Sequence, residues 1–289
     1  EIPDSVLVPD EARSFTPPRA IAIHGDGKKI ERFIFHNQAL EAIEQRALTE
    51  LEALIGEKGV DNLSFPSYWS QADMLRCVYG TKWKAENARK VVIAHLRWLT
   101  TIPADYRLLY STVGRVLNYG ALYVHGRDCY YRPMLILNFT RFDTTHFSVD
   151  EFVNATIFLL EYVKANMFLP GVVENWVALA DLGHQGLTSL PISSFKSVVH
   201  VLQENYRCRL GVSYVVNSPR TISFIWGMIK PFLDKQTVKK VSFHRDSTSQ
   251  QIFTHFNQGQ VERKYGGSAP DVTHFWPPTV PQGPYRITR

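Results

Sequence analysis

Between residues 35 and 110, apolar positions recur with the spacing of helices that bury one face. The first run places the following apolar side chains on one side of a helix: Leu40, Ile43, Ala47, Leu51, Leu54 and Ile55. Gly56 and Gly59 are expected to break this helix. A second run begins near Ser70, and a third covers residues 88–99. The pattern predicts three amphipathic helices in this part of the chain.

After residue 119 the pattern changes to short, almost continuous apolar runs, which cover residues 134–137, 176–180 and 212–216. Strands that are buried on both faces have this character, because helices cover both sides of a parallel sheet. Ser148 and Glu151 form a capping box before one intervening helix, and Pro191 opens another. The alternation of strands and helices predicts an α/β fold with a mainly parallel sheet.

The predicted helix over residues 220–233 is apolar around an unusually wide arc. Its apolar residues are Ile222, Phe224, Ile225, Trp226, Met228, Ile229, Phe232 and Leu233. They span roughly 200°, whereas a helix that faces a single core needs about 100°. Either other helices bury the far side, or the helix covers an apolar cavity or meets a membrane. Gly227 and the Lys230-Pro231 pair predict a hinge or kink.

The composition narrows the class of protein. The 289 residues are 45% hydrophobic and 20% charged, which argues against a disordered chain. No run of 18 uninterrupted apolar residues occurs, and the net charge of +5 is too mild to favour nucleic acid as a partner. Three widely spaced cysteines favour a reducing compartment over a disulfide framework. The aromatic content of 12% fits either a large core or an interior that holds a ligand.

Several motifs in order along the chain resemble those of the CRAL-TRIO lipid-binding family. Residues 217–234, N-S-P-R-T-I-S-F-I-W-G-M-I-K-P-F-L-D, resemble its lid-helix signature. Further similar segments are Leu75-Arg76, Lys82-Trp83, residues 86–98, Gly126-Arg127-Asp128 with Arg132-Pro133, Asp181-Leu182-Gly183, Tyr206 with Arg209-Leu210-Gly211, and residues 262–267. The resemblance extends over about residues 70–267.

This resemblance implies an N-terminal helical bundle packed beside a mixed, mainly parallel sheet. A mobile lid helix would cover an apolar cavity that holds one lipid, with Trp176, Ala178 and Tyr214 in its lining. The family binds, presents or exchanges lipids, so no catalytic residue, cofactor or metal is expected. The implied partners are a lipid or other hydrophobic small molecule and, transiently, a membrane surface, but no nucleic acid. The expected location is cytoplasmic and peripheral to membranes.

The proline distribution and the extent of the resemblance together suggest domain boundaries. Nine of the 16 prolines lie in the two end segments, which predicts extended arms or wraps rather than packed elements. The predicted segments are an extended N-terminal arm (1–34), an N-terminal helical domain (35–112), a lipid-binding domain (113–268) and a proline-rich C-terminal tail (269–289).

The polar residues that hold a phosphatidylinositol headgroup in some family members are only partly present. Thr237 and Lys240 match two of the four positions, whereas Cys208 replaces a Glu and Thr81 replaces an Arg. Thr237, Lys240, Lys239 and Cys208 are therefore the candidates for contact with a headgroup or membrane phosphate. The basic residues beyond the lid form either a solvated positive face or a phosphate clamp centred on Lys240: Lys235, Lys239, Lys240, His244 and Arg245.

Trp176 and Ala178 stand where other members carry the Ser and Thr that bind phosphocholine. Both departures make the implied cavity more apolar, which favours a sterol, an isoprenoid or a neutral lipid. We therefore expect a protein that binds one lipid and exchanges or presents it at membranes. The alternative is an interaction or regulatory module with a collapsed pocket. An enzyme is the poorest option, because the sequence carries no dinucleotide fingerprint, zinc set or nucleophile elbow.

Overall fold

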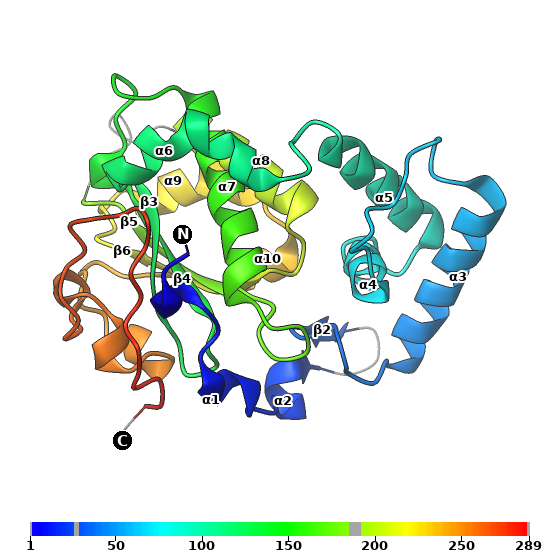
Figure 1. Ribbon diagram of the computed structural model, residues 1–289, viewed down its shortest axis with the longest axis horizontal. Helices are drawn as coiled ribbons and strands as arrows, with labels where there is room; N and C mark the ends of the chain where they lie inside the picture. The colour runs from blue at the N-terminus through cyan, green and yellow to red at the C-terminus, as the bar shows by residue number, and fades with distance from the viewer. Residues whose placement is uncertain (1, 26–28, 185–191, 288–289) are drawn as a thin grey trace.

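The computed structural model describes the chain over residues 2–25, 29–184 and 192–287. Three helices form one end of the molecule, and a sheet with its covering helices forms the other (Figure 1). The three helices are α3 (Ala42–Lys58), α4 (Gln71–Tyr79) and α5 (Ala85–Leu99). This confirms the predicted class, in which N-terminal helices lie beside an α/β lobe.

Local signals set the ends of these helices. Ser70 and Asp73 form a reciprocal capping box at the start of α4, which supplies partners for backbone N–H groups that the helix itself leaves unpaired. Gly59 follows the last residue of α3 with φ of +65°, a value that favours glycine. Gly56 lies inside α3, so the prediction that it breaks the helix is wrong. A single Gly costs only about 1 kcal/mol in a helix that is otherwise stabilised by its buried face.

The lobe is built on a five-stranded sheet with the order β3-β4-β5-β6-β7. The strands are β3 (Leu122–Arg127), β4 (Pro133–Asn138), β5 (Trp176–Asp181), β6 (Leu210–Val216) and β7 (Val241–Phe243). β3 pairs with β4 antiparallel, and every later pairing is parallel. The three apolar runs predicted as strands are therefore the central strands of a mixed, mainly parallel sheet.

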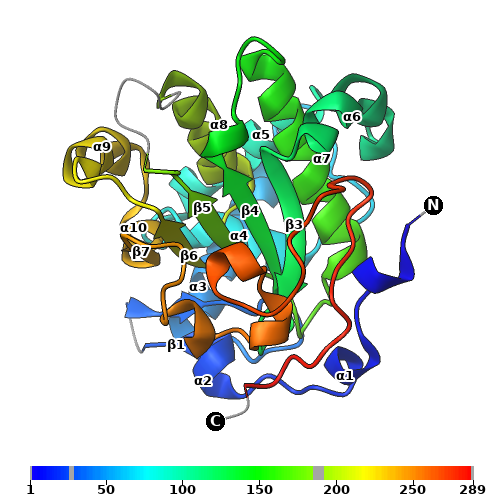
Figure 2. The same cartoon turned by 90° about the vertical axis from the view of Figure 1, so that its left-hand side faces the viewer.

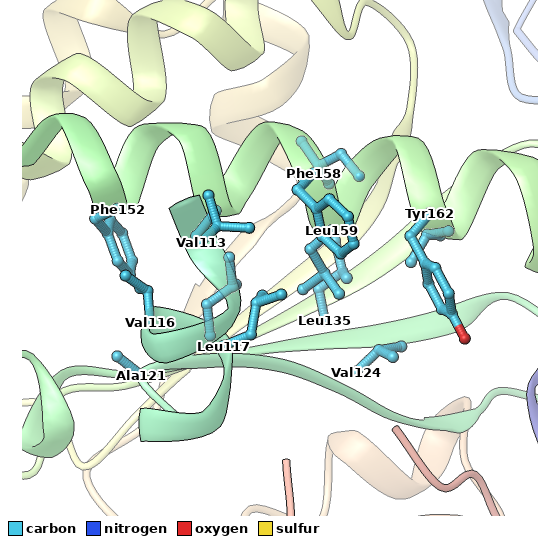
Figure 3. Packing of buried hydrophobic residues seen from close by; sticks show 14 of the residues in the cluster. Val113, Val116, Leu117, Ala121, Val124, Leu135, Phe152, Phe158, Leu159 and Tyr162 are labelled. Carbon is cyan, nitrogen blue, oxygen red and sulfur yellow. The ribbon is translucent and has the colours of Figure 1, made fainter. Parts of the chain in front are cut away.

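Helices cover one face of this sheet. They are α6 (Tyr110–Tyr119), α7 (Val149–Met167) and α8 (Ile192–Asn205), with the 3₁₀ turn η3 (Tyr106–Leu109) beside them. Figure 3 shows Phe158 and Leu159 of α7 packed over Leu135 of the sheet and beside α6. Ser148 caps α7 with the predicted capping box. Pro191, predicted to open α8, lies outside the described residues.

The C-terminal segment covers the opposite face, where it crosses in front of the strands in Figure 2. It carries the short turns η6 (Ile252–Thr254), η7 (Gln258–Gln260) and η8 (Arg263–Tyr265). Ile252, Phe256 and Tyr265 of this segment pack against Ile136 and Leu179 of the sheet. Both faces of the sheet are thus covered, which explains the continuous apolar character of its central strands.

Both ends of the chain pack against the lobe. The N-terminal arm contains short elements: η1 (Asp4–Val6), α1 (Asp10–Arg13), α2 (Arg19–Ala22) and the antiparallel strands β1 (Ile23–His24) and β2 (Glu31–Arg32). Val6 and Val280 are both buried in the core under α7. The buried guanidinium of Arg127 donates to the carbonyls of Val6 (2.7 Å) and Leu7 (3.3 Å). These contacts give the proline-rich ends a fixed course that proline content alone does not predict.

The predicted lid region follows β6. It consists of α9 (Ile222–Ile229), the 3₁₀ turn η5 (Lys230–Phe232) and α10 (Lys235–Lys239), which leads into β7. The α-helical geometry ends at Ile229 and Pro231 lies in η5, as the Lys230-Pro231 pair predicts. In Figure 2, α9 stands at the edge of the lobe, away from the C-terminal segment.

Candidate functional site

The face of the sheet that the helices cover is incompletely closed over the central strands. Val177 and Leu179 of β5 point to the opposite face and are fully buried. Ala178 and Ala180 are only half-buried, although β5 lies between β4 and β6. Leu137, the register partner of Ala180 on β4, is also half-buried. Leu137, Ala178 and Ala180, here called the half-buried patch, keep accessible surface at a place where a packed core would leave none.

Tyr214 does not belong to this patch, which corrects its predicted place in the cavity lining. The parallel register pairs Ala178 with Ser213 and Leu179 with Tyr214. Tyr214 therefore points to the opposite face, where it is buried and its hydroxyl is hydrogen-bonded to Nδ1 of His255. Adjacent residues of a strand face opposite sides, so a shift of one position moves a side chain from one face to the other.

Trp176 shares the face of Ala178 but is only 4% exposed. Its ring centroid lies 5.9 Å from that of Phe168 and 5.9 Å from that of Tyr206. These aromatic neighbours pack Trp176 into the core at the start of β5. Trp176 therefore forms the closed end of this face, and the accessible surface begins with the small side chains that follow it.

The eight apolar residues predicted on the lid fall into three groups. Ile225 is buried, with 3% exposure. The half-buried group contains Ile222, Trp226, Met228, Ile229 and Leu233. Phe224 and Phe232 are 62% and 51% exposed. The wide apolar arc thus reflects one side that faces the lobe and another that faces outward, rather than burial by helices on all sides.

Two contacts attach α9 to the sheet. Ile222 packs against the buried cluster of Phe139, Leu182 and Val215, against which Leu137 and Ala180 of the half-buried patch also pack. The ring of Trp226 lies edge-on to that of Phe243 in β7, with 5.0 Å between centroids. The start and middle of α9 are therefore held against the lobe on the same side as the patch.

The outward side of α9 and η5 combines aromatic and basic character. Phe224 and Phe232 project there, and the ammonium of Lys196 lies 5.0 Å from the ring centre of Phe232. Lys230 is exposed, and a side chain at Gly227 would have no heavy atom within 4 Å. Exposed apolar side chains next to lysines are typical of surfaces that meet membranes or protein partners.

Lys240 is neither a free phosphate clamp nor part of a solvated face. Its ammonium lies 2.7 Å from a carboxylate oxygen of Glu31, which the N-terminal arm contributes. It also donates to the carbonyl of Leu210 at 2.9 Å and lies 4.9 Å from the ring centre of Phe33. Glu31 and Phe33 could not be predicted from the sequence, because no local signal links the N-terminal arm to a residue so distant in the chain.

The other three polar candidates also have partners within the chain. Thr237 donates from its hydroxyl to the carboxylate of Asp234 at 2.5 Å, and Lys239 donates to Gln236 at 3.1 Å. Cys208 packs against the cluster of Phe35, Ala72 and Leu75, and burial raises the pKa of its thiol. The thiol is therefore neutral at physiological pH and offers no charge to a headgroup.

A buried ionic cluster fixes the lobe against the N-terminal helices. Glu174, which precedes β5, accepts hydrogen bonds from the backbone of Phe35 and His36 at 3.0 Å each, and it pairs with Arg76 of α4. His36 Nδ1 lies 2.9 Å from the same carboxylate. Burial raises the pKa of Glu174, but the hydrogen bonds from His36 and the charge of Arg76 outweigh it and lower this pKa to about 2.

Two pockets formed by described residues lie away from α9. One, of about 420 Å³, lies between residues 35–40 and the start of α4, and the other, of about 240 Å³, lies between the N-terminal arm and the start of β6. Within the described chain, no cluster of three or more His, Cys, Asp or Glu residues is arranged to hold a metal ion. Each helix in the described ranges is too short or too polar to cross a bilayer.

The family model described as the CRAL/TRIO domain matches residues 117–267. The chain belongs to the CRAL/TRIO family. The match includes β3 to β7 and the α9 region. The CRAL/TRIO family is known for lipid binding and transfer, and its members are generally lipid-binding proteins rather than enzymes.

Individual relatives agree with this assignment. The chain is 21% identical over 224 residues to the Sec14 cytosolic factor of Schizosaccharomyces pombe, covering 72% of this chain and 78% of that protein. It is 25% identical over 211 residues to an alpha-tocopherol transfer protein-like protein of Mus musculus, covering 70% of this chain and 59% of that protein. The crystal structure of Sfh5 has a TM-score of 0.59 at 18% identity, covering 80% of this chain and 89% of that one.

Some CRAL/TRIO relatives are considerably longer than this chain. It spans 47% of a CRAL-TRIO domain-containing protein of Schizosaccharomyces pombe, at 22% identity, and 26% of one of Caenorhabditis elegans, at 26% identity. The similarity therefore concerns the CRAL/TRIO unit and its N-terminal helices, and not the additional length of those relatives.

Proposed function

We propose that this CRAL/TRIO protein binds one lipid or similarly apolar molecule between the half-buried patch and α9. The observation that carries the proposal is the incomplete burial of Ala178 and Ala180 on a central strand. Small side chains there would leave space for a ligand above the sheet, and Trp176 would close one end of that space. The half-buried Met228 and Ile229 of the lid region supply further apolar surface for such a ligand.

Such a space would solve the energetic problem of moving a lipid between membranes. Transfer of ~30 methylene groups from a bilayer into water costs roughly 24 kcal/mol, at ~0.8 kcal/mol per methylene. A protein interior about as apolar as the bilayer avoids most of this cost. Exchange is then nearly neutral in free energy, and its rate is set by the opening of the covering element.

We propose that α9 is this covering element. Its two contacts with the sheet lie at Ile222 and Trp226, before the end of the α-helical geometry at Ile229. Gly227 and the Lys230-Pro231 pair are positions at which the backbone can change direction with little obstruction. A movement of this segment would expose the half-buried patch directly to a membrane.

The same segment would also make the membrane contact. Phe224 and Phe232 can enter the interfacial region of a bilayer. Lys230 and Lys235 follow closely in the chain, and Lys196 of α8 lies against the ring of Phe232. Each lysine near an anionic surface contributes about 1 kcal/mol. Binding of this strength is reversible, as exchange requires, and fits a peripheral protein of the cytoplasmic membrane surface. No catalytic step is part of this role.

The proposal is tested by extraction of a lipid from vesicles. Purified, delipidated protein is incubated with vesicles that carry a fluorescent lipid, and the protein-bound fraction is measured after sedimentation. Saturable uptake of one lipid per chain supports the proposal. Ile229→Glu should abolish uptake, because the substitution places a charge on the half-buried side of α9.

The alternative role, an interaction module with a collapsed pocket, makes a different prediction for the same experiment. If the protein is an interaction module, the wild-type protein should extract no lipid, and Ile229→Glu should change neither uptake nor folding. That result would reject the lipid-binding proposal.

A further inference from the structure

The ion pair between Glu31 and Lys240 joins the N-terminal arm to the end of the lid region. Its side chains are only 18% and 13% exposed, and the ammonium and carboxylate are 2.7 Å apart. The ring of Phe33 and the carbonyl of Leu210 complete the surroundings of the ammonium. Lys240 is therefore held on several sides by groups of this chain.

This ion pair lies next to the strand that floors the proposed binding space. The carbonyl of Lys240 accepts a hydrogen bond of 2.8 Å from the amide of Ser213. Ser213 is the register partner of Ala178 and shares its face of the sheet. The ammonium itself reaches the carbonyl of Leu210 at the start of β6. The pair thus sits at the edge of the sheet, beside the start of β6.

The charge of Lys240 at this edge is balanced within the chain. Glu31 compensates the ammonium of Lys240, and the hydroxyl of Thr237 is donated to the carboxylate of Asp234. The Cys208 thiol carries no charge. An anionic headgroup that approached Lys240 would have to displace Glu31 from a mostly buried site and would meet its negative charge on the way. A polar end without net negative charge meets no such barrier.

We infer that Glu31 determines ligand specificity: its carboxylate occupies Lys240 and restricts the proposed binding space to lipids whose polar end carries no net negative charge. This inference rests on the proposed function and adds the chemical class of the ligand. Sterols, isoprenoid alcohols and neutral glycerolipids belong to this class. Phosphatidylinositol and phosphatidic acid do not.

The inference is tested with two fluorescent probes in phosphatidylcholine vesicles, a sterol analogue and a phosphatidylinositol analogue, each present in trace amount. Wild-type protein should extract the sterol at least about tenfold better than the phosphatidylinositol. Glu31→Gln keeps the shape of the side chain but frees the ammonium. This variant should take up about tenfold more phosphatidylinositol and retain sterol uptake within roughly twofold.

Two further variants serve as controls. Glu86→Gln removes the carboxylate of an exposed ion pair with Lys58 and should leave both uptakes unchanged. The double variant Glu31→Gln/Lys240→Met should lose the gain in phosphatidylinositol uptake, because the freed cation is absent. Should Glu31→Gln fail to fold, Glu31→Asp withdraws the carboxylate by one methylene and should give a smaller gain in the same direction.

Failure of this inference is distinguishable from failure of the proposed function. Equal extraction of both probes by the wild-type protein, or a gain that persists in the double variant, overturns the role of Glu31 but leaves lipid binding intact. Extraction of neither probe by any variant rejects the proposed function, and the specificity role with it.

Discussion

The indole of Trp226 packs edge-on against the phenyl ring of Phe243, with 5.0 Å between centroids and an angle of 67° between planes. Trp226 belongs to α9 and Phe243 to β7, so this contact fastens the proposed lid to the sheet. Aromatic pairs of this geometry contribute about 0.5–1.5 kcal/mol beyond the area that they bury. The strength of this single contact should therefore influence how often α9 moves away from the lobe.

Replacement of Trp226 by Ala should loosen α9. Backbone amides over residues 222–229 should exchange with deuterium roughly fivefold faster, because the lost contact lowers the local opening free energy by about 1 kcal/mol. Hydrogen exchange with mass spectrometry measures this directly. Phe224→Ala is the matched control, since its exposed ring holds no part of the lobe. Equal acceleration in both variants would contradict the fastening role of Trp226.

The outward phenyl ring of Phe224 should contribute to membrane association. Phe224→Asp removes an apolar group and adds a charge that anionic lipids repel, so binding to vesicles that contain phosphatidylserine should fall roughly tenfold or more. Sedimentation with vesicles measures the bound fraction. Tyr68→Asp changes an aromatic residue of similar exposure elsewhere on the surface and should have little effect. A similar loss in the two variants would argue against a specific contact through α9.

Glu174 should stabilise the fold in a pH-dependent manner. Its pKa is lowered to about 2 from a usual value near 4.5, so its stabilisation is complete above about pH 5 and is lost as the pH falls toward 2. Glu174→Gln should lower the free energy of unfolding by about 3 kcal/mol at pH 7, and the difference from wild type should shrink in acid. Urea unfolding at several pH values checks this. A difference independent of pH would exclude the ionic explanation.

Space over the half-buried patch can be probed by filling it. Ala178→Phe should preserve thermal stability within a few degrees and reduce lipid uptake at least about tenfold, because the ring occupies the proposed binding space. Ala155→Phe is the matched control: Ala155 lies on the buried face of α7 and is fully buried, so overpacking there should cost about 1–3 kcal/mol. If Ala178→Phe destabilised the fold as much as Ala155→Phe does, protein side chains would already fill the space over the half-buried patch.

Local sequence signals predict most of the elements. The capping boxes at Ser70 and Ser148 mark the starts of α4 and α7, and the apolar runs mark β4, β5 and β6. Lys230-Pro231 marks the end of the α-helical part of the lid region. These features depend on neighbouring residues, and the family resemblance adds the placement of the N-terminal helices beside a mixed, mainly parallel sheet.

The remaining features depend on pairings between distant residues. Tyr214 lies on the opposite face because the register of β5 and β6 aligns Leu179 with it, and register is a property of two strands together. Glu31 meets Lys240 only after the N-terminal arm has packed against the lobe. No periodicity in the chain encodes either pairing, so the sequence predicts the candidate residues but not which of them stay available to a ligand.

The central claim is that one lipid occupies the space between the half-buried patch and α9. Native mass spectrometry of the intact protein, measured after exposure to cell-derived lipid vesicles and removal of the excess, tests it most directly. We expect a second species heavier by the mass of a single lipid, present for the wild-type protein and absent for Ala178→Phe. A wild-type spectrum that contains only the mass of the polypeptide would contradict it, as would an adduct that Ala178→Phe retains in full.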